Sequence, residues 1–334
     1  MVEELIKSEL EEKMQEELEA GVQTIQYQIN TLMTTNGQSP FVTIFMYLRE
    51  DDPYIEENAL IIEEILKQRI KGVKNKKGVY VTPTFPKLIY VLTEENCLNG
   101  GKYDYLTHLA AECTAKRIYP DYISEKVMKE NYDGEVFGCM GCRSFLSAWV
   151  DPKTGEKQWE GRFNSGVVTL NLPMVALDSG KDEDKFWEIF EERLTTCYEA
   201  LMCRHKALEG TISDVSPIHW QDGAIARLQP GEKIDDLLHN GFSTLSLGYI
   251  GLFECVKYMT GFSHTEKEGR EFSLRVMNRM RNATDSWKAS TKIAFGLYGT
   301  PAESTCYSLC NKIRNKYGVV EGVTDKAWLT NSYH

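Results

Sequence analysis

The sequence predicts an α/β protein with parallel strands, and three observations lead to this class. Short β-branched and aromatic runs alternate along the chain with longer segments in which apolar residues recur at helical spacing. Strands and helices of these lengths in alternation are typical of parallel sheets covered by helices. With 42% apolar residues over 334 positions, the chain can also bury a large core.

The individual elements follow from the same patterns. Apolar positions at helical spacing predict helices over residues 2–18, 55–70, 105–117, 182–208 and 266–282. Apolar, β-branched runs beside glycine and proline predict strands over residues 41–46, 79–81, 88–92, 167–172 and 292–298, the fourth closed by Pro173. The amphipathic helix at the start of the chain needs a partner surface. No repeat or linker marks a boundary, so we expect one domain over residues 1–334.

Composition excludes several classes of protein. Lys and Arg total 38 and Asp and Glu total 49, a formal net charge of −11, so we expect neither nucleic acid nor a membrane surface as a partner. No stretch approaches the roughly 18 apolar residues of a membrane span. The first twenty residues are acidic and lack a small-residue cleavage site, and nine cysteines, an odd number, favour free thiols in a reducing compartment. We therefore expect a cytoplasmic protein.

The most distinctive stretch is Cys139-Met140-Gly141-Cys142-Arg143-Ser144, which places two thiols in a loop near the middle of the chain. A structural zinc site usually needs four ligands, and only one Cys-x-x-Cys pair is present, so no metal is expected. A thioredoxin-type redox pair would need a helix start after a strand, where the helix dipole lowers the thiol pKa. Both cysteines can also be buried apolar fillers. From the residues alone, the redox and filler interpretations both stay open.

A second candidate is Gly299-Thr300-Pro301-Ala302-Glu303-Ser304-Thr305, directly after a predicted strand. Thr300 as N-cap, Pro301 at the first helical position and Glu303 three residues after the cap form a capping box, so we expect a helix to start there. The unpaired N–H groups of its first turn, with the hydroxyls of Ser304 and Thr305, would suit a phosphate. A capped helix without a ligand is the plainer interpretation, and the Glu303 carboxylate counts against an anion.

A third candidate is Asn164, in a glycine-flanked turn just before a predicted strand. Its amide could orient a substrate hydroxyl, or it could simply form the turn. The sequence contains neither G-x-x-x-x-G-K-[ST] nor G-x-G-x-x-G, so the standard nucleotide-binding motifs are absent. None of the six histidines forms a ligand pair at close spacing.

Taken together, these segments resemble the anaerobic (class III) ribonucleoside-triphosphate reductases, a family of glycyl-radical enzymes. The resemblance covers nearly the whole chain and rests on YQINTLMTTNGQSPFVT, TPTFPKLIY, CMGCRSFLS, GRFNSGVVTLNLP, STLSLGYIGLFE and FGLYGTPAEST. Several long matches in one order are far more specific than any single motif. The resemblance implies part of a ten-stranded α/β barrel with a finger loop through its middle, and reduction of ribonucleoside triphosphates to deoxyribonucleoside triphosphates for DNA synthesis and repair.

The resemblance also implies roles for the site residues. Cys142, at the tip of the finger loop, would become a thiyl radical that removes the ribose 3′ hydrogen, after which the 2′ hydroxyl leaves as water. A loop tip suits a sulfur radical, which must be held against one ribose carbon. Met140 and Ser144 flank Cys142 at the family's spacing, and Asn164 would hydrogen-bond the ribose hydroxyls or the reductant. Cys139 has no assigned role.

Further partners are implied in the same way. The pair Met140 and Asn164 resembles the members that use formate as reductant. The family's substrate-phosphate site matches Thr300, Ala302, Glu303, Ser304 and Thr305. The full-length family enzymes bind nucleotide effectors, form homodimers and receive their glycyl radical from a radical-SAM iron–sulfur activase.

The sequence departs from the family in what it lacks. The glycyl-radical motif of the Arg-Val-Cys-Gly-Tyr type, the zinc-binding cysteines beside it, the ATP cone and the early barrel strand with the second active-site cysteine do not occur. We therefore expect an incomplete catalytic barrel that binds no cofactor itself and is inactive alone. Two alternatives to a reductase segment remain, namely an inert or nucleotide-binding barrel fragment and a Cys-x-x-Cys thiol-redox protein.

Overall fold

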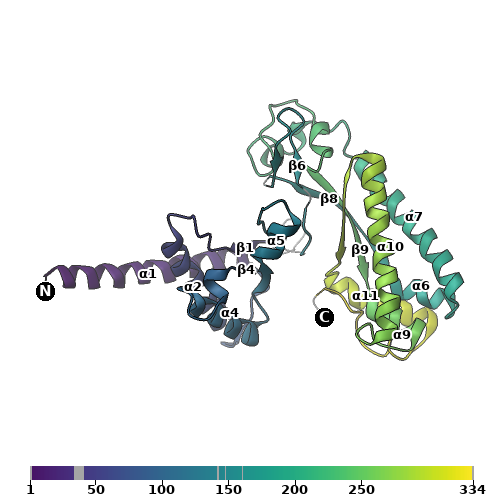
Figure 1. The fold of residues 1–334 in the computed structure, drawn as a ribbon, viewed down its shortest axis with the longest axis horizontal. Helices are drawn as coiled ribbons and strands as arrows, with labels where there is room; N and C mark the ends of the chain where they lie inside the picture. The colour runs from purple at the N-terminus through teal and green to yellow at the C-terminus, as the bar shows by residue number, and fades with distance from the viewer. Residues whose placement is uncertain (1, 34–40, 141–142, 147, 160, 333–334) are drawn as a thin grey trace. The chain divides into compact units, whose positions relative to one another are not determined.

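The structure, a computed structural model, consists of two compact units that divide between Gly141 and Cys142. Unit 1 comprises Met1–Gly141 and unit 2 comprises Cys142–His334 (Figure 1). The described residues are 2–33, 41–140, 143–146, 148–159 and 161–332. The expectation of a single domain over residues 1–334 stays a prediction.

Unit 1 contains a parallel sheet with helices around it (Figure 1). Its elements in chain order are α1 (Val2–Thr31), β1 (Thr43–Met46), α2 (Ile55–Lys71), β2 (Val73–Lys74), β3 (Tyr80–Val81), β4 (Lys87–Leu92), α3 (Glu94–Cys97), α4 (Asp104–Arg117), β5 (Asp121–Ser124) and α5 (Glu125–Asn131). The sheet order is β1-β4-β5 with parallel pairing, and β2 pairs antiparallel with β3. The strands and helices predicted between residues 41 and 117 are confirmed, each within two residues of its predicted ends.

The core of unit 1 lies between the sheet and helices α2 and α4. Leu66 from α2, Leu88 and Tyr90 from β4, and Leu106 from α4 are fully buried in one cluster. Alternate residues of a strand reach opposite faces of the sheet, and β4 is buried at successive positions. Burial on both faces explains why this strand reads as a continuous apolar run, as interior parallel strands do.

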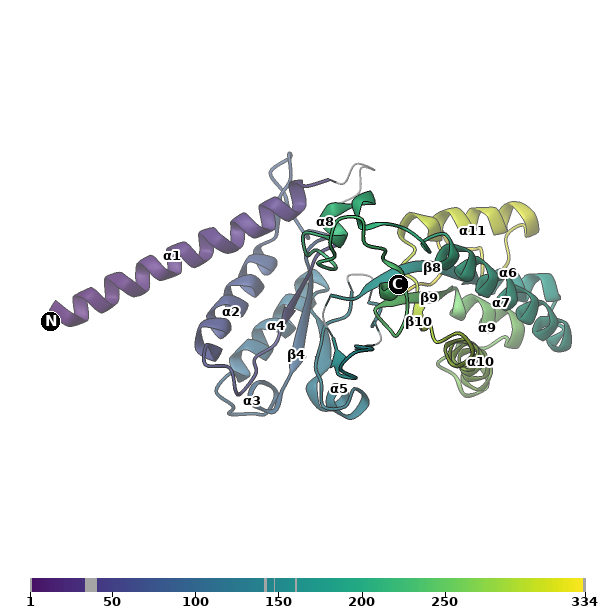
Figure 2. The same ribbon diagram turned by 90° about the horizontal axis from the view of Figure 1, so that it is seen from above.

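Helix α1 is longer than predicted and extends beyond α2 in Figure 2. Its second half packs on unit 1 through the buried Val22 and Ile29, and Gln15 Nε2 donates to Glu64 Oε2 of α2 over 3.2 Å. In its first half, apolar side chains such as Leu10 stay mostly exposed. Apolar residues are thus exposed in this half of α1, and the need of this helix for a partner surface stays a prediction.

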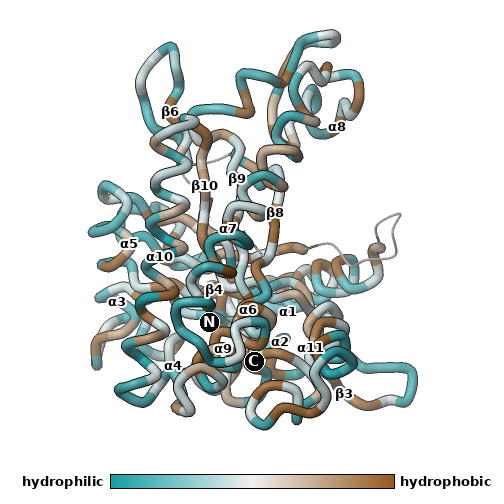
Figure 3. Tube along the Cα trace, turned by 90° about the vertical axis from the view of Figure 1, so that its right-hand side faces the viewer, coloured by the Kyte–Doolittle hydropathy of each residue, from teal (hydrophilic) through white to brown (hydrophobic). Residues whose placement is uncertain are grey.

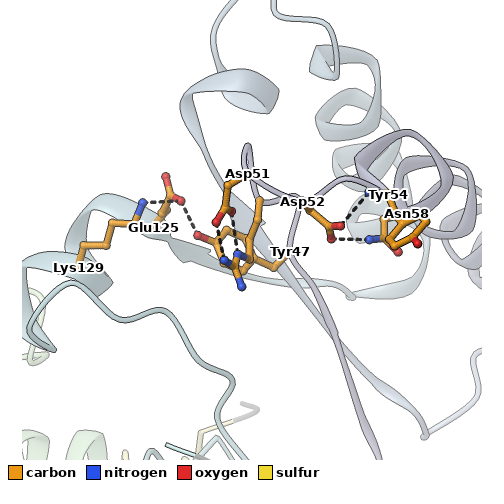
Figure 4. A network of polar contacts seen from close by, with 8 residues as sticks. Tyr47, Asp51, Asp52, Tyr54, Asn58, Glu125 and Lys129 are labelled. Atoms are coloured by element: carbon orange, nitrogen blue, oxygen red, sulfur yellow. Dashed lines mark hydrogen bonds and ion pairs between the residues drawn. The ribbon is translucent and has the colours of Figure 1, made fainter. Parts of the chain in front are cut away.

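A polar network joins the carboxyl ends of β1 and β5 (Figure 4). The Tyr47 hydroxyl, just after β1, donates to Glu125 Oε1 over 2.5 Å, and Lys129 Nζ donates to the same oxygen over 2.9 Å. Burial, together with the Glu125 carboxylate, raises the pKa of Tyr47 above its usual range. In the loop before α2, Asp52 Oδ1 accepts from the Tyr54 amide over 2.9 Å. The Tyr47–Glu125 contact links the ends of two strands that both pair with β4 but not with each other.

Unit 2 is built on a second parallel sheet. Its elements in chain order are β6 (Trp149–Val150), β7 (Lys157–Gln158), β8 (Phe163–Asn171), α6 (Leu172–Ser179), α7 (Glu183–Lys206), the 3₁₀ turn η1 (Ser213–Val215), α8 (Pro217–Trp220), η2 (Asp235–Leu238), β9 (Ser243–Ile250), α9 (Leu252–Thr260), α10 (Lys267–Thr291), β10 (Ala294–Gly299) and α11 (Glu303–Tyr317). Strands β10, β9 and β8 pair in parallel in that order and lie side by side in Figure 3. Strands β6 and β7 form a short antiparallel pair.

Helices α7 and α10 cover one face of this sheet (Figure 1). Phe186 and Phe190 of α7 and Val276 of α10 are fully buried against Leu170 of β8 and Leu247 of β9. One face of the sheet is therefore committed to the core, and the opposite face remains for other contacts.

Two predicted boundaries in unit 2 are wrong, the start of β8 and the end of α10. Strand β8 begins at Phe163, four residues before its predicted start, because a β-bulge interrupts its alternating pattern. The strand ends at Asn171, within one residue of its predicted end, and Pro173 lies in the first turn of α6, where a missing N–H costs nothing. Helix α10 continues to Thr291, well past the predicted residue 282.

In the part of the chain that the structure describes, no helix is both long enough and apolar enough to cross a membrane.

Candidate functional site

The cysteine loop lies where the chain passes from unit 1 to unit 2, and Gly141 and Cys142 fall outside the described residues. Before this point Cys139 is buried and Met140 is 36% exposed, and after it Ser144 is buried. Residues 135–140 and 143–146 form neither helix nor strand. A thioredoxin-type pair needs a helix start close to its cysteines, so the local structure counts against the thiol-redox alternative.

The residues that follow Cys142 lie against the β8–β10 sheet. Arg162, just before β8, donates to the Leu146 carbonyl over 2.7 Å. The Phe145 carbonyl oxygen lies 3.9 Å from the position that a Cβ atom would take on Gly296 of β10. The segment after the cysteine is therefore held over the face of the sheet that α7 and α10 leave uncovered.

That face is polar and made of small residues. On β9, Leu245 and Leu247 point into the helix-covered core, whereas Thr244 and Ser246 lie on the opposite face. A Cβ on Gly296 would lie 3.6 Å from Thr244 Cγ2 and 3.8 Å from Ser246 Oγ, which places Gly296 on the same face. The Thr244 hydroxyl is buried and has no hydrogen-bond partner among the described residues. The Thr244 hydroxyl on this surface is therefore available to form a hydrogen bond with a ligand.

Asn164 is held on this face by a β-bulge. The register between β8 and β9 shifts between Asn164 and Gly166, and such a shift re-aims a side chain. Asn164 Nδ2 donates to Ser246 Oγ over 2.5 Å, and its Oδ1 accepts from the Gly166 amide over 2.9 Å. A Cβ at residue 166 would lie 2.6 Å from Arg204 Nε, so a larger residue there would displace the Arg204 side chain. The orientation of the Asn164 amide is thus fixed by the protein itself.

Thr300 extends the end of β10 and does not cap a helix. Its amide donates to the Tyr249 carbonyl over 3.0 Å, and its hydroxyl lies 3.0 Å from Thr169 Oγ1. The N-cap of α11 is Ala302, which has a left-handed backbone (φ 53°) and makes no side-chain cap bond. The predicted capping box is therefore wrong, because neighbouring strands occupy the groups of Thr300 that would have formed it.

Helix α11 still begins inside the predicted segment. Its first residue is Glu303, whose side chain is not described, and the side chains of Ser304 and Thr305 are exposed. The Thr305 amide donates to the Ala302 carbonyl over 2.7 Å. The first N–H groups of a helix lack intrahelical acceptors and point outward with the positive end of the dipole. The start of α11 thus has the geometry that suits a phosphate group.

The contacts of Asn164 and Thr300 converge on neighbouring positions of β9. Asn164 reaches Ser246. Thr300 lies over Gly248, where a Cβ would be 2.0 Å from Thr300 Oγ1 and 2.9 Å from Thr169 Oγ1. Ser246 and Gly248 are two residues apart on one face, so they lie about 7 Å apart along the strand. The fold therefore brings two of the predicted site residues together on one surface.

Sequence reasoning missed the three β9 residues that form this surface, Thr244, Ser246 and Gly248. A signal was present in STLSLGYIG, where small and large side chains alternate with the period of a strand. Among the residues that the structure describes, no group of three His, Cys, Asp or Glu side chains is placed to hold a metal ion.

The fold is that of solved anaerobic ribonucleotide reductases. A Thermotoga maritima enzyme with glycerol in its active site matches with a TM-score of 0.64 at 18% identity, over 96% of this chain and 50% of the other. A T. maritima structure in complex with dATP and CTP matches with a TM-score of 0.62 at 17% identity, over 95% and 51%. These matches establish an α/β fold with parallel sheets that forms part of a larger architecture.

Sequence comparison identifies the family. The model of the anaerobic ribonucleoside-triphosphate reductase family matches residues 3–334. The anaerobic ribonucleoside-triphosphate reductase of Enterobacteria phage T4 is 43% identical, over 96% of this chain and 52% of the relative, and that of Escherichia coli K12 is 40% identical, over 93% and 43%. The chain belongs to the anaerobic ribonucleoside-triphosphate reductase family, as its sequence predicts. It spans about half the length of these curated relatives.

Proposed function

We propose that this chain is the middle part of the catalytic barrel of an enzyme that reduces ribonucleoside triphosphates to deoxyribonucleoside triphosphates. The observation that carries this proposal is the convergence on β9, where Asn164 bonds Ser246 and Thr300 lies over Gly248. The two positions lie about 7 Å apart along the strand, a separation that a ribose and its first phosphates can bridge. Membership of the family supports the same reading.

The ribose end of the substrate would lie at Asn164. A side-chain amide has two N–H donors and two acceptor lone pairs. Ser246 takes one donor and the Gly166 amide uses one lone pair, which leaves one of each for ribose hydroxyls or for formate. The Thr244 hydroxyl, buried on the same face, would add a further hydrogen bond.

Cys142 would be the residue that removes the ribose 3′ hydrogen, with Met140 and Ser144 on either side of it. The 2′ hydroxyl would then leave as water, and formate would supply the two electrons. In the whole enzyme the radical would come from a glycyl radical made by a radical-SAM iron–sulfur activase. This sequence has no glycyl-radical motif, so the chain alone is proposed to bind substrate without turning it over.

The phosphates would lie at the start of α11. This helix offers N–H groups of its first turn, other than that of Thr305, which donates to the Ala302 carbonyl, and the exposed hydroxyls of Ser304 and Thr305. Thr300 would hold the turn between β10 and α11 in place through its contact with Thr169 of β8. The Glu303 carboxylate would have to turn away from the anion.

Regulation and assembly belong to the whole protein. Solved T. maritima enzymes carry dATP in a specificity site, or dATP together with CTP. By analogy we propose that the complete protein binds nucleotide effectors, forms a homodimer and works in the cytoplasm.

Nucleotide binding to the chain tests the binding part of the proposal. Titration calorimetry without oxygen should show that CTP binds, and that Thr300→Val weakens CTP and tripolyphosphate alike. Ser290→Ala, on the exposed side of α10, is the matched control and should leave both affinities unchanged. Failure of CTP and tripolyphosphate to bind the wild-type chain would reject the proposed site.

Turnover by a complete reductase containing this segment tests the radical role. Cys142→Ser should abolish the formation of deoxyribonucleotides, whereas Cys203→Ser, at an exposed position on α7, should retain it. Residual reduction by Cys142→Ser at the wild-type rate would remove Cys142 from the mechanism. The same pair of variants separates a reductase segment from a fragment that only binds nucleotide.

A further inference from the structure

We propose that Glu254 is a positioning residue for the candidate site. It anchors the segment 326–332, and this segment in turn holds Arg143, the residue after Cys142, and the turn that leads into α11. The inference rests on the proposed function, because only that function makes Arg143 and the turn before α11 parts of a substrate site. The anchoring itself is a property of unit 2 and can be tested without any nucleotide.

Glu254 lies in the first turn of α9 and is fully buried. Its Oε1 accepts from the Thr330 amide over 2.9 Å and from the Thr330 hydroxyl over 2.8 Å, and it forms an ion pair with Lys326. The Gly251 amide donates to the Thr330 carbonyl over 2.8 Å, so both backbone groups of residue 330 are held. A buried carboxylate is costly unless it is paired and hydrogen-bonded, and here one segment supplies all of these partners.

The next two residues reach the candidate site. Asn331 Nδ2 donates to Sγ of Cys306, and Cys306 in turn donates to the Pro301 carbonyl over 3.2 Å, which links the segment to the start of α11. The Ser332 carbonyl accepts from the Arg143 guanidinium. Two extended residues span at most about 7 Å. The position of residue 330 therefore limits where both of these contacts can form.

Other attachments hold the segment further back along the chain. Val323 and Leu329 are fully buried in an apolar cluster, and Arg314 donates to the Thr324 and Lys326 carbonyls over 2.8 Å and 2.6 Å. These contacts end at residue 329. Glu254 acts at Lys326 and at residue 330, where the bond from the Gly251 amide would remain, so its loss loosens the part that touches the site and leaves the apolar packing in place.

A double-mutant cycle between Glu254→Gln and Arg143→Ala tests this linkage, because the two side chains bond to different residues of one segment. All six tryptophans lie in unit 2, so tryptophan fluorescence during urea unfolding follows this unit. Each variant should lower the folded-to-unfolded ratio. Glutamine keeps an oxygen that can accept from Thr330 but loses the ion pair with Lys326, so the anchor is weakened. Arg143→Ala should then have less effect, and the combined change in the folded-to-unfolded ratio should be at least about threefold smaller than the product of the single changes.

Asp178→Asn provides the matched control. Asp178 also accepts from a lysine and a hydroxyl, Lys316 over 2.8 Å and Tyr317, but these contacts tie α6 to α11. The effects of Asp178→Asn and Arg143→Ala on the folded-to-unfolded ratio should be independent, so the double variant should show the product of the two single changes. A multiplicative cycle for Glu254→Gln as well would make Glu254 a purely structural residue and overturn the proposal. If Glu254→Gln does not fold, Thr330→Val removes one hydrogen bond of the anchor and takes its place in the cycle.

Titration with CTP keeps this inference separate from the proposed function. If positioning matters for the site, Glu254→Gln should weaken CTP binding by a factor similar to that of Arg143→Ala, whereas Asp178→Asn should not. Absence of CTP binding by the wild-type chain would defeat the proposed function and leave the coupling intact. CTP binding without coupling in the cycle would defeat this inference alone.

Discussion

The Asn164 side-chain amide donates to the Ser246 hydroxyl across two paired strands, so that one hydrogen bond fixes a residue of β8 from β9. Ser246 is fully buried, and the other end of the amide accepts from the Gly166 backbone. Asn164 therefore has one orientation available. An asparagine at an active site needs that property if it is to direct a substrate hydroxyl.

Ser246→Ala should remove the acceptor of Asn164 and lower the free energy of unfolding of unit 2 by about 1 kcal/mol. Urea unfolding followed by tryptophan fluorescence measures this change. CTP affinity should fall in the same variant, since the amide loses its fixed direction. For comparison, Ser290→Ala removes a hydroxyl that bonds within its own helix and should change stability by less than about 0.5 kcal/mol. Unaltered CTP affinity in Ser246→Ala would contradict the placement of ribose at Asn164.

Gly248→Ala should disturb the turn at Thr300. The new Cβ would lie 2.0 Å from Thr300 Oγ1, so Thr300 must move, and overpacking of this kind costs about 1–3 kcal/mol. Gly296→Ala is a close control, because it lies on the same face of the next strand and its Cβ would have ordinary contacts of 3.6 Å or more. Thermal unfolding and tripolyphosphate titration should separate the two variants. Equal behaviour would mean that the contact at Thr300 has no influence on the phosphate end.

Asp178→Asn should change how stability depends on acid. Burial acts to raise the pKa of Asp178, but hydrogen bonds from Lys316 and Tyr317 outweigh it, so the pKa lies below its usual value. A carboxylate with a lowered folded pKa stabilises the protein above its unfolded pKa of about 4, and this contribution is lost as the pH falls through the folded pKa. The variant should lose about 1 kcal/mol at neutral pH and show a shallower decline below about pH 4. A parallel decline in both proteins would contradict this assignment.

His205→Gln should flatten the pH dependence of stability in a different range. His205 is buried on α7 with its ring 5.3 Å from His239. Burial, and then His239, lower the pKa of His205, although Glu209 acts in the opposite direction. The unfolded chain then takes up the proton first, so stability present above about pH 6.5 decreases as the pH falls through that value.

Urea unfolding between about pH 5 and pH 8 checks this sign. The wild-type protein should lose stability in unit 2 over this range, and His205→Gln should lose less. His108→Gln is the control, because that side chain is 76% exposed on α4 of unit 1. A slope in His205→Gln as steep as in the wild type would show that another group is responsible.

The elements that could be predicted from the sequence are those whose pattern is set by the core they bury. Helix α2 shows this, because its buried apolar residues recur at helical spacing, and strand β4 shows it as a short continuous apolar run buried on both faces. The start of β8 could not be predicted, since the bulge at Asn164 and Gly166 breaks the alternation and makes a strand look like a turn. The pattern of apolar residues therefore predicts regular helices and strands well, but it does not predict irregular positions such as the bulge in β8.

The candidate site divides in the same way. Asn164 and Thr300 were singled out by residue type and by resemblance, but Ser246 and Gly248, which place them, belong to no chemical motif. The capping box at Thr300 failed because the Tyr249 carbonyl and the Thr169 hydroxyl, both distant in sequence, hold that residue in an extended turn. The conformation of such residues depends on contacts between distant segments, and these contacts cannot be predicted from the spacing of residues along the chain.

The alternation along β9 has a consequence for which substitutions the strand can accept. Leu245 and Leu247 lie in the core, so their replacements are limited by hydrophobicity. Thr244, Ser246 and Gly248 lie under the loop residues and the Thr300 turn, so their replacements are limited by volume. Saturation mutagenesis of this one strand should therefore show two selection criteria that change at every residue, one set by the stability of the fold and the other by the room left for a ligand.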